Sequence, residues 1–90
     1  MAHHGLLIVQ RHPCNACAII TALNRETFEK VGAKRKDFTY ELVVIDHPKE
    51  LASMPFVEVE SLPIAVVDDE QITAGTILPP KRLLEILDYL

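Results

Sequence analysis

Apolar residues occur along the chain in four short runs and in two stretches with helical spacing. Short apolar runs are typical of buried β-strands, and here they cover residues 5–10, 40–46, 64–67 and 71–74. Helical spacing extends over residues 14–31, and a last amphipathic helix begins at Pro79-Pro80 and presents Leu83, Leu84, Leu87 and Leu90. A shorter helix is expected over residues 47–54. The predicted order is therefore βαβαββα.

Turn-forming residues set the boundaries of these elements. Pro13 ends the first strand, and Gly32 is expected to cap the C-terminus of the first helix. The strand–helix–strand unit implies a right-handed crossover between two parallel strands, which we expect to be paired at the centre of the sheet. Asp68 and Asp69 tolerate turn conformations and predict a β-hairpin between the last two strands, which Gly75 then ends.

Length and composition favour one packed domain over residues 1–90. Ninety residues support a single core, and no apolar run approaches the roughly 18 residues of a membrane span, so no membrane association is expected. The first residues also lack the apolar core of a signal peptide, which predicts a reducing cytoplasmic setting.

Charge is unevenly distributed along the chain. The net charge is −4, but residues 1–36 carry six Lys/Arg and two Asp/Glu, whereas residues 37–90 carry three and eleven. The basic run at residues 34–36 is short and follows a predicted helix end, so we interpret it as a solvated loop. No nucleic-acid partner is expected.

The two cysteines, Cys14 and Cys17, lie where the first strand leads into the first helix. Side chains three residues apart at a helix start share one side, so the two sulfurs can form a bridge. Unpaired N–H groups and the helix dipole favour a thiolate at Cys14, as in other C-x-x-C redox sites. Cys17 is expected to face inward, on an apolar stripe that continues through Ile20, Leu23, Thr27 and Val31. Cys14 is therefore the predicted attacking sulfur and Cys17 the resolving one.

Other interpretations of the cysteine pair remain open. A metal or iron–sulfur site would use Cys14, Cys17 and His12, with His47 as a fourth ligand at the same sheet edge or with a second chain completing the set. Buried, inert thiols are a third interpretation. The positive charges of Arg11 and His12 could lower the pKa of Cys14, or these two side chains could simply be solvated at a strand end.

The predicted element order, with the Cys-Asn-Ala-Cys motif after the first strand and Leu62-Pro63 before the third, resembles the thioredoxin fold in its compact, glutaredoxin-sized form, as in small thioredoxin-like or glutaredoxin-like disulfide proteins. The resemblance spans nearly the whole chain and implies an α/β fold with a four-stranded mixed sheet flanked by helices. It also implies that Cys14 is the nucleophile, Cys17 the resolving thiol, Pro63 a cis-proline and Gly75 the glycine after the fourth strand.

The function that this resemblance implies is thiol–disulfide exchange through the cysteine pair, with no cofactor beyond the redox-active disulfide. An extended substrate segment would pair with the main chain of Leu62. Glutathione-binding members usually have Thr-Val-Pro and Gly-Gly where this chain has Ser61-Leu62-Pro63 and Ala74-Gly75, which weighs against glutathione recognition. The expected partners are a disulfide-containing protein and a reductase or glutathione, and the expected state is a monomer. A non-catalytic interaction module is the alternative, although such a module would not need both thiols.

Overall fold

The computed structural model describes residues 2–47, 49–50 and 62–89. In these residues the chain forms a mixed α/β structure with the elements β1 (His3–Gln10), α1 (Asn15–Lys34), β2 (Phe38–Ile45), β3 (Ile64–Val67), β4 (Glu70–Ala74) and α2 (Pro80–Tyr89). The short helix predicted over residues 47–54 lies mostly outside the described residues. Neither helix in this part of the chain is both long and apolar enough to cross a bilayer.

The four strands form one sheet in the order β2-β1-β3-β4. β1 and β2 are parallel, as predicted, whereas β3 is antiparallel to both β1 and β4. The expectation that the parallel pair forms the centre of the sheet is wrong, because β2 is an edge strand. The burial of the strands agrees with this order: Leu7 and Ile8 of β1 are completely enclosed, but Leu42 and Val44 of β2 remain 40% and 41% exposed.

The β3–β4 hairpin confirms the turn predicted from the paired aspartates. Asp68 and Asp69 have φ angles of 51° and 66°, and this left-handed conformation at both central residues is what a tight two-residue hairpin turn requires. Val67 and Glu70 pair directly on either side of the turn. A register shift between Ala65 and Val66 interrupts the ladder farther along the hairpin.

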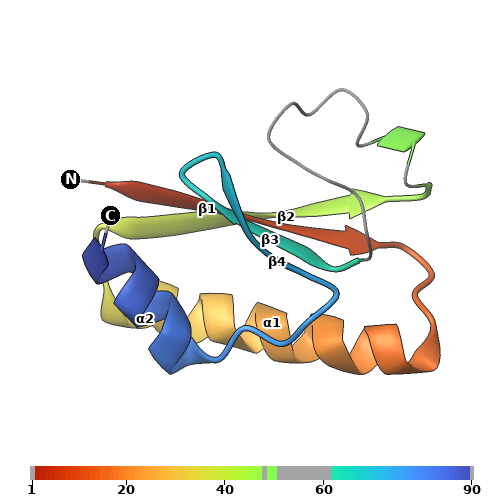
Figure 1. Cartoon of the computed structure of the whole chain (residues 1–90), viewed down its shortest axis with the longest axis horizontal. Helices are drawn as coiled ribbons and strands as arrows, with labels where there is room; N and C mark the ends of the chain where they lie inside the picture. The colour runs from red at the N-terminus through yellow and green to blue at the C-terminus, as the bar shows by residue number, and fades with distance from the viewer. Residues whose placement is uncertain (1, 48, 51–61, 90) are drawn as a thin grey trace.

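Both helices lie on one face of the sheet (Figure 1). Side chains alternate along the strands, so that β1 contributes Leu7 and Val9 to the helix-covered face and Ile8 to the other. The larger buried cluster lies between the sheet and the helices and contains Leu7, Val9, Phe28, Val31, Phe38, Ala65, Val67, Leu78, Leu83 and Leu87. A smaller cluster on the opposite face contains Ile8, Ile45, Ile64 and Val66.

The first helix does not end at Gly32, contrary to the sequence-based expectation. It continues through Lys34, and Arg35 follows in an extended conformation with its N–H donating to the carbonyl oxygen of Val31. Alanine and lysine, which follow Gly32, are strong helix formers and prolong the helix. The guanidinium of Arg35 then binds Asp37 and Asp88 at 2.7 and 2.8 Å, which holds the helix exit against the start of β2 and the end of α2.

Candidate functional site

Cys14 and Cys17 form a disulfide at the N-terminus of α1, with their Cα atoms 4.9 Å apart. This Cα separation lies within the normal range for a disulfide. Cys14 is exposed, whereas Cys17 is half-buried one turn later. The predicted bridge is therefore present, and the two cysteine residues differ in exposure in the predicted direction.

Cys14 is also the N-cap residue of α1. Its backbone is extended, with φ −64° and ψ 165°, and its carbonyl oxygen accepts the N–H of Ala18 at 2.8 Å. The backbone N–H of Cys17 donates to Sγ of Cys14 at 3.1 Å, so the sulfur occupies the place where a capping oxygen usually lies. Negative charge that develops on this sulfur would meet an N–H donor and the positive end of the helix dipole.

The inward-facing side of α1 differs in one respect from the predicted stripe. Thr27 and Val31 are buried as expected, but Leu23 is 39% exposed and Asn24 is completely buried in its place. The Asn24 amide makes this burial tolerable because it donates to the carbonyl oxygen of Thr76 and accepts the N–H of Leu78. Sequence reasoning missed Asn24, although a polar residue at a position with the spacing of the buried face was a signal for it.

Arg11 is fixed to the end of the neighbouring strand. Its N–H continues the β1–β2 pairing by donating to the carbonyl oxygen of Ile45 at 2.9 Å, and its Nε donates to Oδ1 of Asp46 at 2.6 Å. The Arg11 charge is thus paired with a carboxylate. His12, the next residue, is exposed.

The segment after β2 shows what His47 does in the structure. The Glu50 carboxylate accepts the backbone N–H groups of Asp46 and His47 at 2.6 and 2.8 Å, and Nδ1 of His47 accepts the N–H of Lys49 at 3.1 Å. One ring nitrogen is therefore engaged with the local backbone. Within residues 2–47, 49–50 and 62–89, no three histidine, cysteine, aspartate or glutamate side chains come together to hold a metal ion.

The Leu62-Pro63 peptide bond is cis, as predicted. Pro63 is buried, and the pairing of Ile8 with Ile64 places it beside the last residues of β1. The N–H of Gly75 donates to the carbonyl oxygen of Pro63 at 2.8 Å, and Gly75 has a φ of 72°, a conformation that favours glycine. Two residues that are distant in sequence, Pro63 and Gly75, are thereby in direct contact.

The predicted site residues gather at one end of the sheet. The ends of β1 and β2, the beginning of β3 and the beginning of α1 all lie at this end (Figure 1). Cys14 and Cys17 belong to the helix start, Arg11 and His12 to the connection before it, and Leu62-Pro63 to the start of β3. The structure thus brings the cysteine pair and the cis Leu62-Pro63 segment, which we call the proline corner, to a common end of the molecule.

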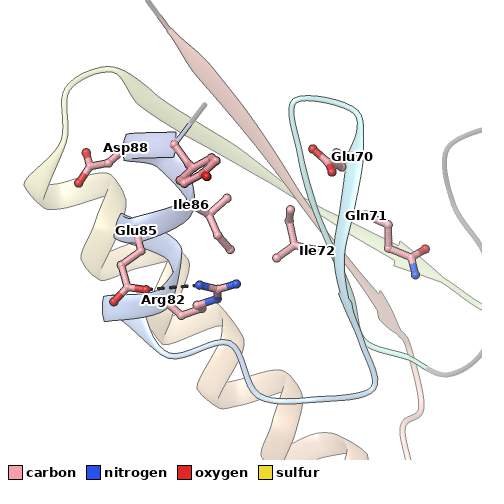
Figure 2. Close-up of a pocket in the computed structure, with 8 residues that line it drawn as sticks. Glu70, Gln71, Ile72, Arg82, Glu85, Ile86 and Asp88 are labelled. Atoms are coloured by element: carbon pink, nitrogen blue, oxygen red, sulfur yellow. Dashed lines mark hydrogen bonds and ion pairs between the residues drawn. The ribbon is translucent and has the colours of Figure 1, made fainter.

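A separate groove of about 740 Å³ lies between β4 and α2. Figure 2 shows Ile72 of β4 and Ile86 of α2 pointing toward each other across it, with the Arg82–Glu85 ion pair on the helix side. The other lining residues are Glu70, Gln71, Asp88 and Tyr89. None of the predicted site residues lines this groove, so it is not part of the candidate site.

The arrangement at the helix start can interconvert between a disulfide and two thiols. Cys14, the exposed residue of the pair, is accessible to another molecule, and the half-buried Cys17 is bonded to it. A two-electron exchange of sulfur–sulfur bonds is the chemistry that such a pair supports. In comparisons with models of known protein families and with curated proteins, the chain has no match.

Proposed function

We propose that the protein is a thiol–disulfide oxidoreductase of the thioredoxin or glutaredoxin type that works through Cys14 and Cys17. The observation that carries this proposal is the disulfide between an exposed N-cap cysteine and a half-buried cysteine one helical turn later. The four-stranded mixed sheet with a proline corner at the same end is compatible with a thioredoxin-like fold.

The first step starts from the reduced protein. The Cys14 thiolate attacks one sulfur of a substrate disulfide, so that a mixed disulfide forms while the substrate S–S bond breaks and its second sulfur leaves as a thiolate that takes up a proton. The N–H of Cys17 and the N-terminus of α1 stabilise the attacking thiolate. Exposure of Cys14 gives the substrate access to it.

The second step closes the internal bridge. The Cys17 thiol loses its proton, its sulfur attacks Sγ of Cys14, and the remaining substrate sulfur leaves as a thiolate. The substrate has then gained two electrons and two protons, and the protein holds the Cys14–Cys17 disulfide. An external dithiol reductase, or two glutathione molecules, returns the two electrons and two protons.

Residues around the dithiol would hold the substrate. An extended segment could pair with the main chain of Leu62, because Pro63 has no N–H to offer and β3 begins only at Ile64. Gly75 supports this corner through its bond to Pro63. Arg11 and His12, which precede Cys14 in the chain, would contribute to substrate binding.

The proposal includes the setting in which such a protein works. It would act as a monomer in a reducing cytoplasm, where a close cysteine pair is catalytic more often than structural. A disulfide-containing protein would be the substrate, and a reductase or glutathione the electron donor. Beyond the internal disulfide, no cofactor is required for this cycle.

Reduction of insulin tests the proposal directly. With dithiothreitol as the electron donor, the wild-type protein should accelerate insulin reduction, and Cys14→Ser should show only the rate of dithiothreitol alone. A parallel assay with the mixed disulfide of glutathione and hydroxyethyl thiol, with glutathione as donor, separates the two classes of reductant. If the wild-type protein accelerates neither reaction, the proposed function is wrong.

A further inference from the structure

Asn24 is a completely buried amide in the middle of α1. Both ends of its side chain bind one segment of backbone: Nδ2 donates to the carbonyl oxygen of Thr76 at 3.0 Å, and Oδ1 accepts the N–H of Leu78 at 2.7 Å. Thr27, also buried, donates from Oγ1 to the carbonyl oxygen of Leu78 at 2.6 Å. Three side-chain hydrogen bonds therefore hold residues 76–78 against α1.

Residues 76–78 connect β4 to α2, and they begin directly after Gly75. The N–H of Gly75 in turn binds the carbonyl oxygen of Pro63. The connection from α1 to Pro63 thus has three links. The Asn24 side chain binds the backbone of Thr76, Thr76 follows Gly75 in the chain, and Gly75 binds Pro63. This connection joins α1, which carries the cysteine pair, to the proline corner.

We propose that Asn24 is a positioning residue, which holds the Pro63 corner in a fixed place relative to the cysteine pair and thereby favours protein disulfides as substrates. The inference rests on the proposed function. An extended protein segment must contact both the sulfur and the corner, so its binding depends on their relative position. A small disulfide needs to reach only the exposed sulfur.

Asn24 acts on the site through the backbone and not through the sulfurs. It lies seven residues beyond Cys17 on the same helix, which corresponds to about 10 Å along the helix axis. Loss of the amide would leave the N–H of the buried Leu78 without its present partner, and the carbonyl oxygen of the exposed Thr76 would no longer be bound to α1. Residues 75–78 would then shift or fluctuate, and the proline corner would move with them because Gly75 is bound to Pro63.

Kinetics with two substrates separate positioning from a merely structural role. For Asn24→Leu, which has a similar volume, the KM for insulin is expected to rise about tenfold with kcat within about twofold, since both side-chain hydrogen bonds of Asn24 are lost. The rate with hydroxyethyl disulfide and the pH profile of Cys14 alkylation should stay unchanged. Equal losses with both substrates, or an unchanged insulin KM, would overturn the inference.

A milder pair of variants guards against a folding defect in Asn24→Leu. Thr27→Val removes only the bond to Leu78 and should raise the insulin KM about two- to threefold. Thr21→Val, at a half-buried threonine on another side of α1, is the matched control and should leave the insulin KM unchanged. Similar effects of the two threonine variants would contradict the assignment.

Hydrogen exchange tests the connection without an activity assay. In Asn24→Leu, the amides of Leu78 and Gly75 should both exchange about tenfold faster, while that of Val66 in β3 keeps its protection. Faster exchange at Leu78 alone would show that Asn24 does not hold the Pro63 corner, and the inference would fail. Failure of the proposed function would instead be seen as a wild-type protein that reduces neither substrate, whatever the exchange result.

Discussion

The guanidinium of Arg11 is bound to the carboxylate of Asp46, with Nε and Oδ1 2.6 Å apart. The pair joins the residue that follows β1 to the residue that follows β2. Arg11 is three positions before Cys14 in the sequence. Both side chains are more than half exposed, so the pair contributes little to stability. Its expected consequence is electrostatic, because Asp46 offsets a positive charge that is three residues before the candidate nucleophile in the sequence.

Replacement of Asp46 should therefore make the surroundings of Cys14 more positive. In reduced Asp46→Asn, we expect alkylation by the anion iodoacetate to accelerate about two- to threefold relative to alkylation by neutral iodoacetamide. The ratio should return toward the wild-type value at high salt. Arg11→Gln should change the ratio in the opposite direction, and an unchanged ratio in both variants would show that the pair has no electrostatic effect on Cys14.

The different exposure of the two sulfurs predicts different behaviour of the two serine variants. Cys17→Ser retains the exposed nucleophile and should accumulate a mixed disulfide with a protein substrate, because the resolving sulfur is absent. Cys14→Ser should accumulate at least about tenfold less. Non-reducing electrophoresis after acid quenching measures the trapped species. Equal trapping by both variants would contradict the assigned roles.

Gly5 is a position where even one methyl group should be destabilising. A Cβ atom there would lie 2.8 Å from the Phe38 ring and 3.2 Å from the Phe28 ring. Both rings are buried and in edge-to-face contact, so neither can move away freely. We expect Gly5→Ala to lower the free energy of unfolding by about 1–3 kcal/mol, measured by urea denaturation.

Gly32 provides the matched control for Gly5. It lies inside α1, and a Cβ atom there would be 3.4 Å from the Tyr40 ring, at the edge of ordinary contact. Gly32→Ala should stabilise the protein by about 0.5–1 kcal/mol, because alanine loses less backbone entropy in a helix. If Gly32→Ala were instead as destabilising as Gly5→Ala, the described environment of these glycines would be wrong.

The ion pairs of Arg35 predict a pH dependence of stability. Hydrogen bonds from Arg35 hold the pKa of Asp37 below its ordinary value, with burial acting in the opposite direction. A carboxyl group with a lowered folded-state pKa stabilises the protein above its unfolded-state pKa of about 3.9, and this stabilisation is lost as the pH falls through the folded-state value. Asp37→Asn should therefore lower the urea midpoint at neutral pH, with a difference that shrinks at about pH 2.5.

Asp88, the more exposed partner of Arg35, serves as the comparison for this pH dependence. Asp88→Asn should lower the urea midpoint at neutral pH less than Asp37→Asn does, because a single exposed ion pair contributes little. A midpoint difference for Asp37→Asn that is the same at neutral and acidic pH would show that charge pairing is not its cause.

Local patterns were sufficient to predict most of the elements and the cysteine pair. The apolar runs that became β1 and β3, the helical spacing after Cys14 and the turn at Asp68-Asp69 depend on neighbours within a few residues. The bridge between Cys14 and Cys17 is also local, since one turn of helix brings the two residues together. Such features can be predicted because the backbone preferences that cause them act over short distances.

Sequence alone determined that a cysteine pair lies at a strand–helix junction in an α/β chain, and that Cys14 is the more exposed residue of the pair. Only the tertiary structure decided that β2 is an edge strand and that Asn24 is buried while Leu23 is exposed. Each of these depends on partners more than 30 residues away or on which strand obtains neighbours on both sides. Local periodicity carries no information about such partners, because hydrogen bonds and burial between distant segments are chosen by how the whole sheet and its helices pack.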